Sequence, residues 1–484
     1  DIHDLLNHNG GQGNTGGSGG GSPAHSNAAP PRLIGPLSGS VASTATPQLR
    51  WQLAAGTDGA AVDICGDRAC GNPIFQTTVT GTSVVPSAPL PAGHVFWRAR
   101  GTAGGVPGRT SSAVWELFIP HRVTAASTAV ATWVDFNGDG YSDFVLSGRV
   151  LLGGPSGYAG SFTVPGGPAE ATLEGYNAAG DVNGDGFGDL IRLDQTPLGT
   201  VGLWTPNVFF GGAQGFTPGA ADVTVQMTGA PGGFVLGNDV NGDGYADSVF
   251  QTRFNLTAYY GSAAGISDGP PPQIFTSQSF TLAGGDVNGD GFSDAISGAN
   301  GVPGIEVTRG SAAGFLATGD VLNLPSLPEF GFLAMMDANG DGFADAAVGQ
   351  PGGIAFFAGS PAGLASTPFA TLANPSFSPI AAGDFNGDGQ PDIVGETSGP
   401  GVTLEVHYGH GGVPDPAGVT LTPPTPFDPD PAAGAFGDVN GDGFDDLTVG
   451  LFTTDPVTQK LTVTSALLYL GGPSGLSTTG IPQG

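Results

Sequence analysis

Basic residues are scarce in this sequence: lysine and arginine total 12 against 42 aspartates and glutamates, for a formal net charge of −30, and the single lysine is Lys460. Proteins that bind nucleic acid or anionic membranes need clustered cations to contact phosphates, so neither partner is expected. No run of 18 apolar residues occurs, so no membrane-spanning helix is expected. Such a large acidic surplus indicates bound cations.

Cysteine is also scarce, because the chain contains only Cys65 and Cys70. Four residues separate them, which is not the CxxC spacing of redox or metal pairs, and no histidine is nearby. We therefore expect a local disulfide and an oxidising compartment. The chain starts at Asp1 with no charged and then apolar leader, which is typical of a processed or trimmed chain.

Glycine and proline, by contrast, are abundant, with 87 and 41 residues. Without a three-residue period they argue against collagen and for many short elements joined by tight turns. Long helices are therefore not expected. The hydrophobic fraction of 39%, with 29 phenylalanines spread along the chain, is sufficient for a folded core.

The first region, residues 1–31, consists mostly of Gly, Ser, Asn and Pro and reads as a flexible tether. Its tip carries Ile2, Leu5 and Leu6, which would allow the alternative that it docks on a neighbouring subunit as an added strand or short helix.

Residues 32–120 contain short alternating apolar runs separated by Gly, Pro, Asp and Ser, which is typical of an antiparallel β-sandwich. The segments PQLRW, VFWRA and SAVW carry Trp51, Trp97 and Trp115. This series resembles fibronectin type III domains, in which such tryptophans are buried. We expect the three tryptophans in the core; the alternative is a carbohydrate-stacking surface.

Residues 121–484 contain the motif DxNGDGxxD seven times, at intervals of 46 to 58 residues. An apolar run precedes each copy, and two more follow, the second ending in a glycine-rich turn. With a fourth strand in the variable stretch, each repeat predicts a four-stranded antiparallel unit, and seven such units predict a seven-bladed β-propeller. Little sequence follows the last copy, so residues 121–124 are expected to supply or share its outer strand. The expected fold class is therefore all-β: a flexible tail, a small sandwich and a seven-bladed propeller.

The motif predicts a cation site in each repeat. Side-chain oxygens at positions 1, 3, 5 and 9 and a backbone carbonyl at position 7 form a hard-oxygen cage on a tight turn, and its flexible geometry suits Ca²⁺ better than Mg²⁺. Turns alone do not require three aspartates at fixed offsets, so about seven Ca²⁺ ions are expected. The expected ligands are Asp135, Asn137, Asp139, Tyr141 and Asp143; Asp181, Asn183, Asp185, Phe187 and Asp189; Asp239, Asn241, Asp243, Tyr245 and Asp247; Asp286, Asn288, Asp290, Phe292 and Asp294; Asp337, Asn339, Asp341, Phe343 and Asp345; Asp384, Asn386, Asp388, Gln390 and Asp392; and Asp438, Asn440, Asp442, Phe444 and Asp446.

An EF-hand would need a glutamate at position 12, and no copy has an acidic residue there. The pattern instead resembles the FG-GAP/VCBS repeats of integrin alpha-chain propellers and of many secreted bacterial proteins. The resemblance implies the same ligand positions and places the calcium loops on one rim. It also implies that ligands bind the opposite rim, where the longest loops are expected at residues 195–207 and 453–465. The sixth copy departs from the pattern with Gln390 and Pro391.

We expect a secreted or cell-surface protein that acts without catalysis in adhesion, recognition or a surface assembly, with a protein or glycan ligand. Two alternatives remain: a filament or sheath subunit that self-associates through residues 1–31, and a propeller enzyme acting on polysaccharides. Beyond residue 120 the only histidines are His121, His407 and His410, and no GxSxG or HExxH motif occurs. No enzyme activity, catalytic residue or organic cofactor is therefore expected.

Overall fold

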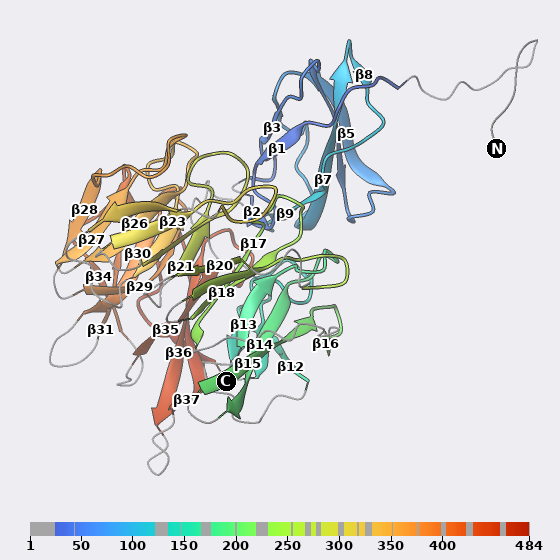
Figure 1. Cartoon of the computed structure of the whole chain (residues 1–484). Helices are drawn as coiled ribbons and strands as arrows, with labels where there is room; N and C mark the ends of the chain where they lie inside the picture. The colour runs from blue at the N-terminus through green and yellow to red at the C-terminus, as the bar shows by residue number, and fades with distance from the viewer. Residues whose placement is uncertain are drawn as a thin grey trace, which may run out of the picture.

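The computed structural model of the chain is all-β, and its described residues contain no α-helix (Figure 1). Accordingly, no helix in that part of the chain is long and apolar enough to cross a membrane. The structure describes residues 25–42, 44–121, 134–146, 148–165, 176–198, 201–218, 231–252, 255–266, 273–276, 282–298, 304–316, 319–324, 332–350, 352–374, 377–397, 403–422, 429–454 and 461–483.

The N-terminal unit consists of a three-stranded and a six-stranded sheet. The smaller sheet has the order β1-β3-β6; the larger has the order β2-β9-β7-β4-β5, with β8 added beside β7. Their bounds are β1 Arg32–Gly35, β2 Ser40–Val41, β3 Leu49–Gln52, β4 Gly59–Cys65, β5 Pro73–Thr80, β6 Ser83–Val84, β7 Gly93–Ala103, β8 Val106–Pro107 and β9 Trp115–Ile119.

Trp51, Trp97 and Trp115 are all buried in the core of this unit, as predicted. The rings of Trp97 and Trp115 meet edge to face, with centroids 6.0 Å apart. The predicted disulfide between Cys65 and Cys70 is also present. The tail prediction falls mostly on residues 1–24, outside the described residues, but its end lies on the sandwich, where the Ser26 N–H donates to the Pro107 carbonyl at 2.9 Å.

The described residues of the C-terminal region form seven sheets in which consecutive strands pair antiparallel. The first has three strands, each of the other six has four, and a two-stranded hairpin, β32-β33, is inserted in the sixth. The bounds are β10 Phe144–Leu146, β11 Arg149–Leu152 and β12 Gly160–Thr163; β13 Tyr176–Gly180, β14 Asp189–Leu198, β15 Val201–Phe210 and β16 Thr217–Pro218; β17 Pro231–Asn238, β18 Asp247–Thr252, β19 Asn255–Tyr259 and β20 Gln273–Thr276; β21 Leu282–Gly285, β22 Asp294–Gly298, β23 Gly304–Thr308 and β24 Asp320–Asn323; β25 Leu333–Met336, β26 Asp345–Gln350, β27 Gly353–Phe357 and β28 Ala370–Ala373; β29 Phe377–Gly383, β30 Asp392–Thr397, β31 Thr403–His407, β32 Gly409–His410, β33 Val413–Pro414 and β34 Val419–Leu421; and β35 Pro429–Gly437, β36 Asp446–Thr454, β37 Leu461–Tyr469 and β38 Ile481–Gln483.

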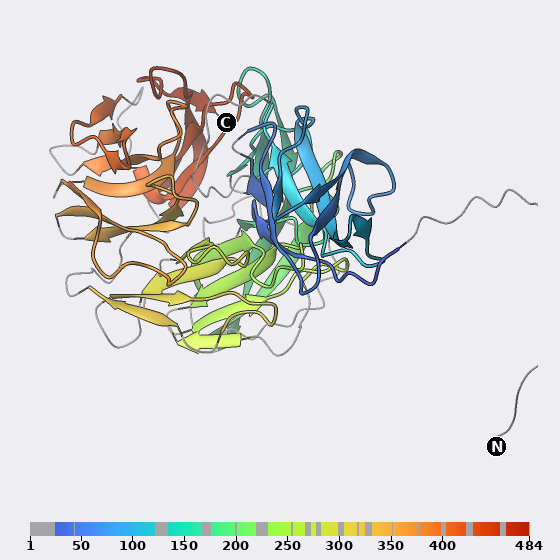
Figure 2. The same cartoon turned by 90° about the horizontal axis from the view of Figure 1, so that it is seen from above.

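The seven sheets follow one another around a centre, as Figure 2 shows. The first strands of neighbouring sheets lie side by side, for example β13 with β17 and β21 with β25. Buried apolar clusters fill the spaces between neighbouring sheets, and the cluster of Phe144, Leu146, Leu151 and Ala466 joins the first sheet to the last. The arrangement is compatible with a propeller. No strand of one sheet pairs with the next among the described residues, so seven-bladed closure remains a prediction.

One expectation about this region is wrong. The segments expected as long loops at residues 195–207 and 453–465 lie largely in the extended hairpins β14-β15 and β36-β37, where Gln195 pairs with Trp204 and Thr453 with Thr462. The outer strand of the last sheet is β38, which pairs with β37. The expectation that residues 121–124 supply or share this strand falls, apart from His121, outside the described residues. A proline at position 482 is tolerated in β38 because an edge strand leaves one side of its backbone unpaired.

Candidate metal centres

In six of the seven sheets the DxNGDGxxD motif forms the turn between the first and second strands, and in the first sheet it directly precedes β10. The first aspartate organises this turn: Asp135 Oδ1 accepts a hydrogen bond from the Gly138 N–H at 2.7 Å, and Oδ2 accepts one from the Gly140 N–H at 2.8 Å. Both glycines have positive φ, at 71° and 89°, which glycine adopts without strain. The motif glycines are therefore required by the turn itself.

The ninth-position aspartate ties the turn to the sheet. Asp143 Oδ2 accepts from the Phe136 N–H at 2.8 Å, and its Oδ1 accepts from the Gly153 N–H, beyond β11, at 2.9 Å. The same pair of hydrogen bonds recurs in every copy of the motif, at Asp189, Asp247, Asp294, Asp345, Asp392 and Asp446. This carboxylate is thus a structural acceptor as well as a candidate ligand.

Positions 3 and 5 lie at the tip of the loop. In the first motif the Asn137 side-chain amide donates to Asp139 Oδ2 at 2.8 Å, and Asp139 Oδ1 accepts from the Tyr141 N–H at 3.1 Å. The latter bond is present in all seven copies. The five predicted donors of a copy therefore belong to one short turn.

Burial raises the pKa values of the aspartates at positions 1 and 9, and the charges of neighbouring carboxylates raise them further. The pKa of Asp286 rises to about 6 and that of Asp294 to about 8, from 3.8. Asp384 and Asp392 repeat this difference, at about 6 and about 8, as do Asp438 and Asp446. Each loop therefore holds two carboxylates whose negative charge is costly without a proton or a cation.

The donor set fits Ca²⁺ chemically, because each motif offers three carboxylates, one amide oxygen and a backbone carbonyl and no nitrogen or sulfur ligand. Within the described parts of the chain, however, no three acidic, histidine or cysteine side chains form a ready metal-binding group. Their oxygens are engaged instead by the backbone N–H groups of the turn, as in the first motif. Calcium binding thus remains a prediction resting on donor chemistry and charge.

Consecutive motif loops are also joined to one another. The position-8 N–H of one motif donates to the position-1 carbonyl of the preceding motif, as from Gly188 to Asp135 at 2.8 Å. The position-7 aromatic ring covers the preceding position-4 glycine: a Cβ on Gly138 would lie 2.6 Å from the ring of Phe187. The sixth motif lacks both features, since Pro391 has no N–H and Gln390 has no ring; a Cβ on Gly340 would meet nothing within 4 Å.

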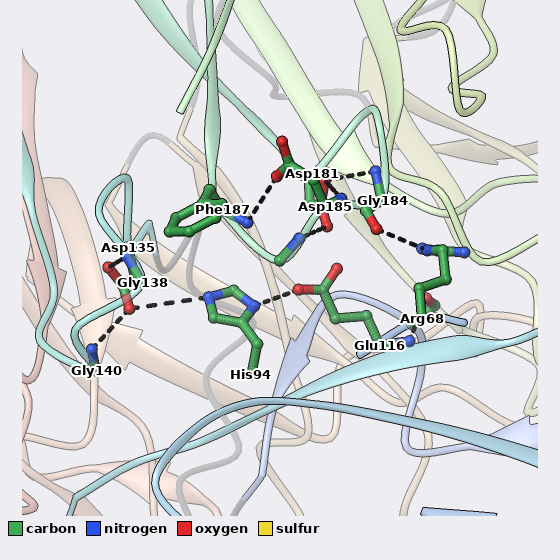
Figure 3. A network of polar contacts seen from close by, with 12 residues as sticks. Arg68, His94, Glu116, Asp135, Gly138, Gly140, Asp181, Gly184, Asp185 and Phe187 are labelled. Carbon is green, nitrogen blue, oxygen red and sulfur yellow. Dashed lines mark hydrogen bonds and ion pairs between the residues drawn. The ribbon is translucent and has the colours of Figure 1, made fainter. Parts of the chain in front are cut away.

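The sequence did not indicate that the N-terminal unit contacts the motif loops. Figure 3 shows His94 between Glu116 of the sandwich, with which it forms an ion pair, and Asp135 of the first motif, 3.8 Å from its Nε2. Burial alone would lower the pKa of His94, but the charges of Glu116 and Asp135 outweigh it and raise that pKa. These side chains line a cavity of about 50 Å³ between the two units, together with Asp181.

The histidines of β31 and β32 lie in different surroundings. His407 is fully buried, its Nδ1 lies 2.8 Å from the carbonyl oxygen of Asp415, and its ring packs edge-on against Phe377. His410 is exposed on the β32-β33 hairpin. The geometry favours a structural role for His407.

Comparisons with known proteins identify one repeat family. The FG-GAP-like repeat matches residues 337–395, which span the fifth and sixth motifs and the strands β26 to β29. No curated protein matches the chain. Because the match covers one stretch, the other motif copies resemble this family only by their sequence pattern.

Two solved structures show a weak overall likeness. One is an Agrocybe aegerita lectin described by its specific recognition of non-reducing terminal N-acetylglucosamine. The two sequences are 15% identical, the match covers 76% of this chain and 92% of the lectin chain, and the TM-score is 0.41. The other is the Tc holotoxin pore of Photorhabdus luminescens, with 16% identity, 82% of this chain but only 18% of that chain covered, and a TM-score of 0.32. With TM-scores below 0.5, these likenesses support no conclusion about this chain.

Proposed function

We propose that this protein is a calcium-binding β-propeller that acts without catalysis in adhesion, recognition or a surface assembly, outside the cell or at its surface. Three findings support this proposal: the FG-GAP-like repeat at residues 337–395, the all-β fold and the Cys65–Cys70 disulfide. Disulfides persist in oxidising compartments, which agrees with an extracellular location.

One observation carries the calcium part of the proposal. In every motif, two aspartates whose negative charges repel each other are held in or near the protein interior, as Asp286 and Asp294 are. A divalent cation would neutralise this charge without protonating the carboxylates. The residues that would hold it are those at positions 1, 3, 5 and 9, with the carbonyl at position 7. Calcium would supply positive charge and would be coordinated by these oxygen atoms. This coordination would fix the loop residues in one conformation.

The recognition part of the proposal assigns the ligand-contacting face to the rim opposite the motif loops. The long hairpins β14-β15 and β36-β37 belong to the second and seventh sheets and extend from the ends of those sheets that lie away from the motifs. The N-terminal unit contacts the motif loops and so leaves these hairpins uncovered, as Figure 1 shows. A protein or glycan ligand would bind there.

Calcium titration of metal-free protein by isothermal calorimetry tests the proposal. We expect about seven Ca²⁺ per chain at millimolar concentration, the affinity range of extracellular calcium modules. Fewer than five would overturn it. Sedimentation velocity with and without residues 1–31, in calcium and in chelator, distinguishes the structural-subunit alternative. Large calcium-dependent assemblies that vanish on truncation would favour a filament or sheath subunit, and a monomer throughout would favour a recognition module.

A further inference from the structure

The N-terminal unit approaches the motif loops through their backbone carbonyls. The Trp115 indole N–H donates to the Gly242 carbonyl at 3.1 Å, and the Ser38 hydroxyl donates to the Gly244 carbonyl at 3.2 Å. The Arg32 guanidinium donates to the Asp290 carbonyl. All three acceptors occupy positions 4 to 6 of a motif, so the third and fourth loops present their tips to the sandwich.

Arg68 contacts two motif loops at once. Its Nε donates to the Gly184 carbonyl of the second motif at 3.1 Å, and its Nη2 donates to the Gly244 carbonyl of the third. Its Nη1 donates to the Val114 carbonyl, within its own unit, at 3.1 Å. One guanidinium therefore joins three backbone segments, two from the propeller region and one from the sandwich. Lysine could not reproduce this planar fork of donors.

Aromatic rings complete the environment of Arg68. Its guanidinium lies over the ring of Tyr245, 4.0 Å from the centroid, and 5.6 Å from the centroid of Phe96. Tyr245 belongs to the third motif and Phe96 to β7, so these cation–π contacts also bridge the two units. A Cβ on Gly184 would lie 2.3 Å from Arg68 Nε, which shows how closely the arginine fits against the second loop.

The disulfide fixes the segment that carries Arg68. Cys65 is the last residue of β4, and its bond to Cys70 closes a short ring that contains the arginine. Within this ring the Cys70 N–H donates to Asp67 Oδ1 at 2.8 Å. The ring limits the conformations available to the segment and holds Arg68 at the junction, which reduces the entropy lost when the two units dock.

We propose that the tips of the second and third motif loops form an interaction surface for this chain's own N-terminal unit, and that Arg68 on the Cys65–Cys70 loop is the latch that holds the two together. The docked sandwich covers the motif rim on the side of the first four sheets (Figure 2). Removing the guanidinium releases the sandwich, and removing the disulfide, which frees the segment that carries Arg68, weakens the docking. The hydrogen bonds of Arg68 to the loops are made to carbonyls at positions 4 and 6, which are not among the predicted calcium ligands.

Hydrogen exchange on the full-length chain tests the latch, in saturating calcium and in chelator. The variants are Arg68→Ala, Arg68→Lys, the double variant Cys65→Ser/Cys70→Ser, and Arg109→Ala as a control, because Arg109 is an exposed arginine of the same unit. Amides of the second and third motif loops and of residues 113–116 report on docking, and amides of β4 and β7 report on the fold of the sandwich. Small-angle scattering measures the radius of gyration in parallel.

Both Arg68 variants are expected to exchange at least about tenfold faster at the junction, because hydrogen bonds from a charged donor are lost. Their radius of gyration should rise, the cysteine variant should show a smaller change, and the Arg109 variant should match wild type. Junction protection in Arg68→Ala equal to that of the control would overturn the proposal. If Arg68→Ala also unfolds β7, Arg68→Lys decides: retained docking would overturn the latch, and release with an intact β7 would support it.

Discussion

The backbone N–H of Ser142 donates a 3.0 Å hydrogen bond to the carbonyl of Asp438, which joins the first motif loop to the last. Five other pairs of consecutive motifs are linked in the same way, by hydrogen bonds of 2.8 to 3.1 Å. The link between the fifth and sixth motifs is missing because Pro391 has no N–H to donate. The motif loops are therefore coupled along the rim as well as within each sheet.

This coupling predicts the effect of proline at position 8. Ala246→Pro removes the N–H that donates to the Asp181 carbonyl at 3.0 Å, and it should lower the free energy of unfolding by about 1–3 kcal/mol. Ala246→Ser is the matched control, since serine occupies position 8 in the first and fourth motifs; it keeps the backbone N–H, so its effect should be smaller than that of proline. Urea unfolding measures both. Equal stability of the two variants would show that the link contributes nothing.

A second prediction separates two costs of replacing a motif glycine. Gly138 and Gly340 occupy the same position, with φ of 71° and 77°, so alanine is strained at both. Only at Gly138 would the new Cβ also meet a ring, that of Phe187, at 2.6 Å; at Gly340 it meets nothing within 4 Å. Gly138→Ala should therefore be less stable than Gly340→Ala by about 1–3 kcal/mol. Identical melting temperatures would argue against the ring contact.

The raised pKa values predict opposite pH dependences with and without calcium. The folded metal-free protein binds protons more tightly than the unfolded chain, so its free energy of unfolding should fall as pH rises from about 4 to about 8. Calcium binds deprotonated carboxylates, so at saturating calcium this loss should disappear or reverse. Thermal melts at several pH values measure the trend, and parallel pH curves in both conditions would contradict it. The carboxyl groups that titrate in this range include those with a pKa of about 6, which are Asp286, Asp384 and Asp438, and those with a pKa of about 8, which are Asp294, Asp392 and Asp446.

The sequence was sufficient to predict the all-β fold and the turn-forming motif, because both depend on local patterns: apolar runs of strand length and Asp, Asn and Gly at fixed offsets. It failed at the hairpin β14-β15, where Gln195 and Pro197 lie in a polar, proline-containing stretch that resembles a loop. It also gave no sign of the Arg68 junction, since the carbonyls that bind this arginine are far along the chain and lie in glycines that the turn already explains. Contacts between units depend on docking geometry, which local sequence does not encode.

The fifth motif allows ligand and structural roles of aspartate to be separated. Asp341 is exposed at the loop tip, and its Oδ1 accepts one hydrogen bond, from the Phe343 N–H at 3.0 Å. Asp345 is fully buried and accepts from the N–H groups of Ala338, Asn339 and Gly359 at 2.8 to 3.1 Å. Both are predicted calcium ligands, but only Asp345 also supports the metal-free fold.

Asp341→Asn and Asp345→Asn should therefore each remove about one Ca²⁺ from the titrated stoichiometry. In metal-free protein, Asp341→Asn should change the free energy of unfolding by less than about 0.5 kcal/mol, because the site is exposed. Asp345→Asn should lower it by about 1–3 kcal/mol, since its amide NH₂ would face a backbone N–H that has lost its acceptor. Unchanged calcium stoichiometry in Asp341→Asn would count against the ligand assignment. Unchanged metal-free stability in Asp345→Asn would count against the structural role of Asp345. The two measurements therefore test the ligand role and the structural role independently.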